Sequence, residues 1–211
     1  MVSPGEFIPL FEKYGVISNL DRFVWEEVFI HLSNYKKKGY KLVPVSMNVS
    51  RVDAYNSYLS DIFMNLTKKY DIEPKYIHLE ITESAYTKSP KQIIKTSIDL
   101  KKQGFSIEMD DFGSGYSSLN MFSMLEVDVI KLDIDFVQNE TSKSIDRSIL
   151  GDVIYMAHRM NIRVVAEGVE TNEQLNKLRM VNCDFVQGYL LKKPIPSDEF
   201  ENELKKLLVF A

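Results

Sequence analysis

Short apolar runs alternate along this chain with longer stretches whose apolar residues recur at helical spacing. Apolar, β-prone runs bounded by turn residues are typical of buried strands, and apolar residues three and four positions apart are typical of helices. Six strands are expected, over residues 41–50, 76–81, 105–110, 128–137, 162–169 and 183–191. The helices expected between and after them cover residues 53–70, 90–104, 117–125, 143–161, 171–182 and 197–210. This alternation predicts successive βα units.

The chain is expected to begin with two helices before its first visible strand. In the first, residues 3–15, Ser3 can cap the helix, Pro4 suits the first helical position and Glu6 completes a capping box. The second covers residues 19–39. A helix at the start of a βα protein should follow a strand, which this chain does not contain.

Polar residues distinguish between the two architectures that six parallel βα units allow, an open doubly wound sheet and most of a (β/α)₈ barrel. A polar side chain lies at or near the C-terminal end of every expected strand. These residues are Asn48, Glu80, Asp110 with Asp111, Lys131 with Asp133, Glu167 and Gln187. In a barrel these ends converge on one mouth, whereas an open sheet would spread them along an edge. We therefore expect an α/β fold of the TIM-barrel type.

Closing an eight-stranded barrel requires two strands more than the six counted here. We expect these two strands to precede residue 1. Residues 1–211 are accordingly interpreted as a single barrel domain that is incomplete at its N-terminus.

Composition limits the classes of partner. A chain of 211 residues with 45% hydrophobic content can bury one sizeable core. The net charge of -4 argues against binding a nucleic-acid polymer. A single cysteine, Cys183, excludes an internal disulfide, and the sequence has neither a long apolar run nor a secretory signal. We expect a cytoplasmic domain that does not insert into a membrane, although a longer protein could tether it.

The stretch IEMDDFGSGYSSL, residues 107–119, ends an apolar run on two adjacent carboxylates. Asp110 and Asp111 alone would fit an ordinary turn. Together with Glu80, Glu167 and the amide oxygen of Asn48, they form a hard oxygen-ligand set suited to Mg²⁺ or Mn²⁺. Two adjacent aspartates can also hold two ions, as in two-metal phosphoester hydrolysis.

The three histidines do not join this set, because His31 and His158 fall within expected helices and His78 within a strand. Zinc is therefore disfavoured.

Lys131 has two interpretations that the sequence leaves open. It could supply a fixed positive charge near an attacking water or a phosphate, or it could form a structural ion pair with Asp133. A Schiff-base role is disfavoured, because neighbouring carboxylates stabilise the ammonium form. Glu83 and Glu170 each follow another glutamate by three residues and are expected only to support the site.

Seven motifs in order resemble the EAL domains, barrel phosphodiesterases that hydrolyse cyclic di-GMP to linear pGpG. The motifs are SPGEFIPLFEKYGVI, SMNVS, LEITES, DDFGSGYSSL, VIKLDIDFV, VVAEGVET and CDFVQGYLLKKP. The resemblance covers nearly the whole chain. It implies a metal-dependent hydrolase of bacterial second-messenger signalling with a two-metal site for Mg²⁺ or Mn²⁺.

The resemblance also implies a role for each candidate residue. Metal ligands would be Asn48, Glu80, Asp110, Asp111 and Glu167. Lys131 would orient the catalytic water, Glu167 could act as general base, and Gln187 would lie near water and substrate. Glu83 would anchor the loop that follows Asp111, and the residues Asp133, Glu170 and Pro194 would lie beside the loop or the substrate.

The Glu-Ala-Leu stretch that gives the family its name would lie upstream of residue 3 and is absent. The two strands missing from the count are those that the family places there. We therefore interpret the chain as a fragment or a naturally shortened EAL domain and expect weak or absent hydrolysis by it. The alternative is a non-catalytic module that binds cyclic di-GMP. Exposed strand edges also predict a homodimer or a larger assembly.

Overall fold

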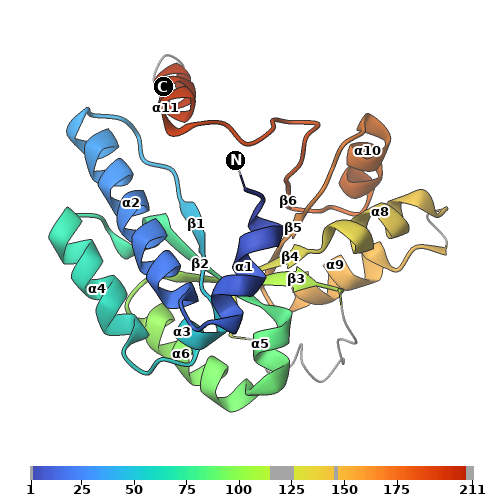
Figure 1. Ribbon diagram of the computed structural model, residues 1–211. Helices are drawn as coiled ribbons and strands as arrows, with labels where there is room; N and C mark the ends of the chain where they lie inside the picture. Colours follow the sequence, from blue (N-terminus) through green and yellow to red (C-terminus); the bar gives the residue numbers. More distant parts are fainter. Residues whose placement is uncertain (1, 115–125, 145–146, 208–211) are drawn as a thin grey trace.

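The computed structural model describes residues 2–114, 126–144 and 147–207. Its centre is a parallel sheet in which the six strands follow one another in chain order (Figure 1). The strands are β1 (Val45–Asn48), β2 (Ile77–Thr82), β3 (Ser106–Phe112), β4 (Val129–Leu132), β5 (Arg163–Ala166) and β6 (Phe185–Val186). All six expected strands are present, and the α/β prediction is confirmed.

Helices flank the sheet on its outer side, with α2 and α4 on one flank and α8, α9 and α10 on the other (Figure 1). Before β1 lie α1 (Pro4–Lys13) and α2 (Ile17–Lys37). Between strands lie α3 (Arg51–Ala54), α4 (Leu59–Tyr70), the 3₁₀ turn η1 (Pro74–Tyr76), α5 (Glu83–Lys88), α6 (Pro90–Lys102), α8 (Ile134–Ser142), α9 (Leu150–Arg159) and α10 (Asn172–Met180). The last element is α11 (Ser197–Leu207).

The core lies between the sheet and these helices. Side chains alternate between the two faces of a strand, and the apolar residues of β2 to β5 share the helix-facing side. Leu79, Ile107, Ile130 and Val164 are each fully buried there. The opposite, inner face carries polar residues, so the sequences of the central strands contain polar as well as apolar positions.

Several elements differ from the sequence-based expectation. The strand expected over 128–137 ends at Leu132, because Asp133 accepts hydrogen bonds from the backbone N–H groups of Asp135 and Phe136 and so caps α8. The helix expected over 53–70 is two helices, α3 and α4. Helix α5 follows β2 directly and was not expected.

The prediction of a capping box at the start of α1 is wrong, since the Ser3 side chain makes no capping hydrogen bond. The helix expected over residues 117–125 falls largely on residues 115–125, outside the described part.

Two strands lie at the edges of the described sheet. β1 pairs only with β2, and β6 pairs only with β5, among the residues that the structure describes. Helix α11 reaches α2 across the opening between these edges, where Lys38 Nζ lies 2.8 Å from Glu201 Oε2. The expectation of two further strands concerns sequence before residue 1 and stays a prediction.

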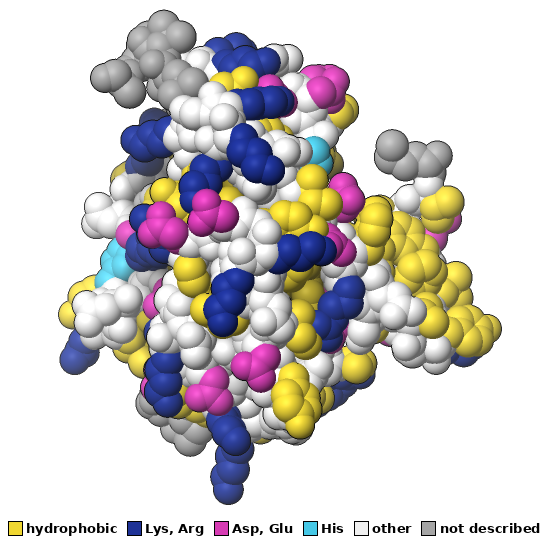
Figure 2. Space-filling view, turned by 90° about the vertical axis from the view of Figure 1, so that its left-hand side faces the viewer, with side chains coloured by type: hydrophobic (Ala, Val, Ile, Leu, Met, Phe, Trp, Pro, Cys, Tyr) yellow, Lys and Arg dark blue, Asp and Glu magenta, His cyan; other side chains and the backbone are white. Residues whose placement is uncertain are grey.

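The outer surface carries charges of both signs. Figure 2 shows lysine and arginine side chains interspersed with acidic and apolar ones on the face that it presents. Within the described ranges, no helix is both long enough and apolar enough to cross a membrane.

Candidate active site

Three carboxylates converge on Lys131 at the carboxyl ends of the central strands. Its Nζ lies 2.7 Å from Glu167 Oε1, 2.8 Å from Glu80 Oε1 and 3.2 Å from Asp110 Oδ1. Lys131 and Glu80 are buried, at 6% and 7% exposure. The four side chains come from β2, β3, β4 and the residue that follows β5, so consecutive strands build one cluster.

Strand geometry explains why these side chains meet. Within β2 and β3, Thr82 pairs with Asp110, and Glu80 lies two residues before Thr82 on the same face of the sheet. Lys131 pairs with Val165, and Glu167 lies two residues beyond Val165 on that face. The convergence predicted for Glu80, Asp110, Lys131 and Glu167 is therefore present. The alternative ion pair of Lys131 with Asp133 is wrong, because Asp133 caps α8 instead.

Burial and charge act in opposite directions on this cluster. Burial alone would lower the pKa of Lys131, but the carboxylates of Glu80 and Asp110 and the hydrogen bond to Glu167 raise it above its ordinary value. Burial raises the pKa of Glu80 and of Glu167, and the Lys131 ammonium offsets part of that rise. Lys131 therefore remains positively charged at neutral pH.

The end of β3 is irregular, and this places Asp111. The register between β3 and β4 shifts between Met109 and Phe112, and Asp111 has a φ of 57°, in the left-handed region. Asp111 is exposed as a residue, but the protein atoms around its carboxyl partly desolvate it, and this desolvation together with repulsion from Asp110 raises its pKa. Glu83, which is buried, accepts a hydrogen bond of 3.0 Å from the Gly113 N–H. Glu83 therefore holds the turn that follows Asp111.

The donor types suit an oxygen-preferring divalent cation. Asp110 Oδ1 is a buried oxygen that forms an ion pair with the Lys131 ammonium at 3.2 Å but accepts no well-aligned hydrogen bond from the described residues, so it retains a lone pair for a cation. Among the described residues, no three acidic, histidine or cysteine side chains are close enough together to hold an ion. The carboxylates are instead gathered around Lys131. The residue types fit Mg²⁺ or Mn²⁺, and Asn48, Glu80, Asp110, Asp111 and Glu167 are the side chains that would hold it.

The remaining candidates lie around this centre. Asn48 ends β1 and Gln187 follows β6, so both occupy the open edges, and both are exposed. Glu170 is exposed, and its backbone N–H donates to Gln174 Oε1. Pro194 lies in the segment between β6 and α11. Among the described residues, no hydrogen bond or ion pair joins these four side chains to the Lys131 cluster.

A second polar layer lies beneath the cluster and was missed by sequence reasoning. His78 Nδ1 and Glu108 Oε1 are 2.7 Å apart, each two residues before a carboxylate of the cluster and on the same face. Burial alone would raise the pKa of Glu108, but hydrogen bonds from His78 and Ser46 outweigh it and lower the pKa. Counting back two residues from Asp110 would have identified Glu108.

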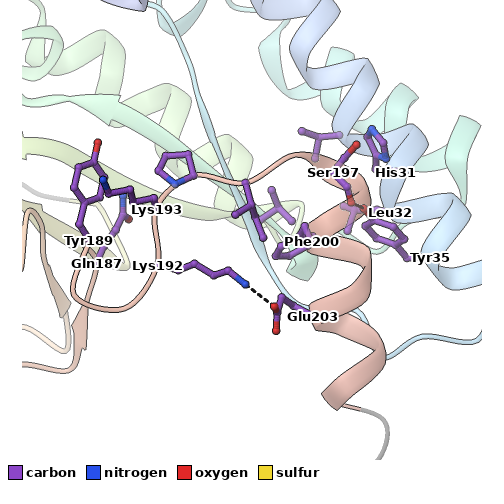
Figure 3. Close-up of a pocket in the computed structure, with 15 residues that line it drawn as sticks. His31, Leu32, Tyr35, Gln187, Tyr189, Lys192, Lys193, Ser197, Phe200 and Glu203 are labelled. Carbon is purple, nitrogen blue, oxygen red and sulfur yellow. Dashed lines mark hydrogen bonds and ion pairs between the residues drawn. The ribbon is translucent and has the colours of Figure 1, made fainter.

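A cavity of about 730 Å³ lies between the open strand edges. Its lining includes Val45 of β1, Gln187 after β6, Pro194, and Phe200 of α11. Figure 3 shows the segment of residues 187–193 on one side of this cavity and α2 with α11 on the other. Gln187 and Pro194 are thus brought together at this cavity, between the two edges of the described sheet.

Comparison with known proteins gives matches over nearly the whole chain. A family model described as EAL domain matches residues 1–194. The bifunctional diguanylate cyclase/cyclic di-GMP phosphodiesterase MucR of Pseudomonas aeruginosa is 30% identical over 94% of this chain and 29% of its own length. The cyclic di-GMP phosphodiesterase NbdA of the same organism is 33% identical over 97% of this chain and 26% of its own length.

Among solved structures, the phosphodiesterase PaMucR in complex with c-di-GMP superposes with a TM-score of 0.87. It is 30% identical, over 94% of this chain and 81% of that chain. The present chain spans less than a third of the length of the two curated relatives named above.

Proposed function

Since the chain belongs to the EAL domain family, we propose that the EAL domain to which it corresponds binds cyclic di-GMP and hydrolyses it to linear pGpG with divalent metal ions, and that residues 1–211 alone hydrolyse it weakly or not at all. The observation that carries this proposal is the convergence of Glu80, Asp110 and Glu167 on Lys131 at the carboxyl ends of parallel strands. Active sites of barrels are built at these ends. The relatives MucR and NbdA, both described as cyclic di-GMP phosphodiesterases, support the same substrate.

Hydrolysis of a phosphodiester requires a deprotonated water and stabilisation of the charge that develops on the phosphate oxygens. Glu167 is the proposed proton acceptor, because burial raises its pKa and so strengthens it as a base. Lys131 holds a fixed positive charge 2.7 Å from that carboxylate and orients the water or the phosphate. Gln187 would contact the substrate from the facing edge.

Mg²⁺ or Mn²⁺ would activate the water and neutralise phosphate charge when bound. The proposed ligands supply oxygen atoms from four carboxylates and one amide, as such ions prefer. These are Asn48, Glu80, Asp110, Asp111 and Glu167. Glu83 acts on this set indirectly, through its hydrogen bond to Gly113.

The whole chain, residues 1–211, is proposed to act as one domain. A cytoplasmic location is proposed from the composition, since a single cysteine suits a reducing compartment.

The decisive experiment is incubation of the purified chain, and of a version extended upstream by about 40 residues, with cyclic di-GMP and either Mg²⁺ or Mn²⁺, followed by chromatography of the nucleotides. The variant Glu167→Gln should form no pGpG. Glu173→Gln is the matched control, because Glu173 is an exposed glutamate on α10 that pairs only with Lys177 among the described residues. It should leave turnover unchanged. No pGpG from either protein with either metal would overturn the hydrolase proposal.

A second candidate function is a non-catalytic module that binds cyclic di-GMP. The observation that favours it is the lack, among the described residues, of three acidic or histidine side chains near enough to hold an ion. The exposure of Asn48 and Gln187 on the open edges also favours it. Calorimetric titration of the nucleotide separates the two functions, since binding without pGpG formation supports the module.

Self-association is a further part of the proposal. β1 and β6 each have one strand partner among the described residues, and unpaired strand edges favour pairing with another chain. A dimer or larger assembly should therefore form. Sedimentation velocity over a range of concentrations tests this, and a monomer throughout the range would contradict it.

A further inference from the structure

Trp25 is the only tryptophan in the sequence, and its side chain is fully buried on α2. The indole Nε1 donates a hydrogen bond of 2.9 Å to the backbone carbonyl of Asn48, the last residue of β1. Its ring packs against Phe63 of α4 with centroids 4.5 Å apart. A helix distant from the carboxylates thus reaches the backbone of a proposed metal ligand.

The same stretch of α2 makes two further contacts with the turn that follows Asn48. Asp21, one helical turn before Trp25, accepts a hydrogen bond of 2.9 Å from the Ser50 N–H. Arg22 Nη2 lies 2.6 Å from Asp53 Oδ1, and Asp53 is 2% exposed. The segment from Asn48 to Asp53 is therefore held along its length by one face of α2.

These contacts matter because β1 is an edge strand of the described sheet. On one side its backbone is held by β2, and the Val49 N–H donates to the Glu80 carbonyl at 2.9 Å. Among the described residues no strand supports the other side. The Trp25 hydrogen bond thus takes part of the positioning role that a second neighbouring strand fulfils for Glu80 and Asp110.

We infer that Trp25 is a positioning residue, whose indole hydrogen bond fixes the Asn48 backbone so that the Asn48 amide can serve the divalent-cation site. This inference rests on the proposed function. Groups that orient metal ligands typically affect affinity about 10- to 100-fold. The binding of a metal, measured without substrate, separates this inference from the question of hydrolysis.

The first test is calorimetric titration of Mn²⁺ into the wild-type chain and into Trp25→Phe, which keeps an aromatic ring but removes the N–H donor. Mn²⁺ affinity should fall by about tenfold. Phe63→Leu is the matched control, because it loosens the same packing without touching the Asn48 carbonyl. Equal weakening in both variants, or unchanged affinity in Trp25→Phe, would overturn the inference.

Asn48→Ala completes a double-mutant cycle. If Trp25 acts through Asn48, adding Trp25→Phe to Asn48→Ala should change Mn²⁺ affinity by less than about twofold. A further tenfold loss would mean that Trp25 acts by another route. Absence of saturable Mn²⁺ binding in the wild type would also overturn the inference, whereas bound Mn²⁺ without pGpG formation would overturn only the hydrolase proposal.

A second measurement does not depend on the folding of a Trp25 variant. Because Trp25 is the only tryptophan, the intrinsic tryptophan fluorescence of the chain arises beside Asn48. Saturating Mg²⁺ should change the emission of the wild type and leave that of Asn48→Ala unchanged. An identical response in both proteins, or no response in the wild type, would contradict the proposed link.

Discussion

Lys131 Nζ lies 2.7 Å from Glu167 Oε1, although the two side chains belong to different βα units. The same ammonium is within 2.8 Å of Glu80 and 3.2 Å of Asp110, so a single protein cation balances three buried or half-buried carboxylates. Acidic residues this close together repel one another unless a positive charge lies between them. Lys131 therefore contributes to stability as well as to the proposed chemistry.

Replacing Lys131 with Gln should lower the free energy of unfolding at pH 8 by about 3 kcal/mol, because it leaves buried carboxylates without their cation. The pKa values of Glu80 and Glu167 are raised, so the folded state binds protons more readily than the unfolded state and gains stability as the pH falls. Removing Lys131 raises these two pKa values further, because the ammonium no longer stabilises the carboxylates, and so increases the stability gained as the pH falls. Urea unfolding at pH 8 and pH 5 should therefore show a smaller deficit at pH 5.

Lys101→Gln is the control for the Lys131 variant. Lys101 Nζ lies 3.0 Å from Asp128 Oδ1, but both side chains are 31% exposed. Its loss should cost less than about 1 kcal/mol at either pH. Similar deficits for the two variants would mean that burial does not distinguish them.

Glu83→Ala should weaken Mn²⁺ binding and lower stability by about 2 kcal/mol, because the Gly113 N–H loses its acceptor. Glu83→Gln retains an acceptor oxygen and should restore most of both properties. Calorimetry and urea unfolding measure the two effects. If the Gln variant is as impaired as the Ala variant, the negative charge of Glu83 matters rather than its hydrogen bond.

Asp21→Asn should change the pH dependence of stability. Burial raises the pKa of Asp21 to about 6. The hydrogen bonds from Ser50 lower this pKa, and repulsion from Asp53 raises it. The folded state thus binds this proton more tightly than the unfolded state, so the contribution of Asp21 to stability falls as the pH rises from 4 to 6. The free energy of unfolding should therefore fall less between pH 4 and pH 6 in Asp21→Asn than in the wild type, by on the order of 2 kcal/mol. Thermal unfolding at the two pH values measures this difference.

Asp71→Asn is the matched control for Asp21, because the Asp71 side chain is 90% exposed in its pair with Lys36. Loss of this exposed ion pair should lower the free energy of unfolding by less than about 1 kcal/mol. An unaltered profile for Asp21→Asn would show that Asp21 does not titrate in this range.

Gly188→Ala should destabilise the chain by more than about 2 kcal/mol, since the added Cβ would lie 2.2 Å from the backbone oxygen of Val169. Because Gly188 follows Gln187, the variant should also lose nucleotide binding. Gly39→Ala has a positive φ of 78° but meets no atom within 4 Å, so its cost should be about 1 kcal/mol. Differential scanning calorimetry ranks the two, and equal melting temperatures would contradict the steric argument.

Much of the fold could be predicted because the pattern of apolar residues depends on local geometry. The apolar runs around Leu79, Ile107, Ile130 and Val164 identified four central strands correctly, since each residue packs against helices. The convergence of Glu80, Asp110, Lys131 and Glu167 followed from one rule, that parallel strands end at the same side of a sheet.

Other features depend on contacts that no local pattern encodes. The sequence allows Asp133 either to continue a strand or to cap a helix. In the structure it caps α8, because its side chain accepts hydrogen bonds from the backbone that follows. The bonds from Trp25 to Asn48 and from Asp21 to Ser50 join residues far apart in the sequence. Strand periodicity alone could have predicted that Glu108 faces the inner side of the sheet. Its partner His78, on the neighbouring strand, could not be predicted from that pattern.

The order of the strands has a consequence for how the chain acquires its structure. Each strand pairs with the strand that comes next in the sequence, as Val45 does with Ile77. Every pairing therefore closes a loop of only moderate length, whose entropic cost is limited. During synthesis, each new βα unit can add to the units already formed, so the sheet can grow in the order of the sequence as the polypeptide leaves the ribosome.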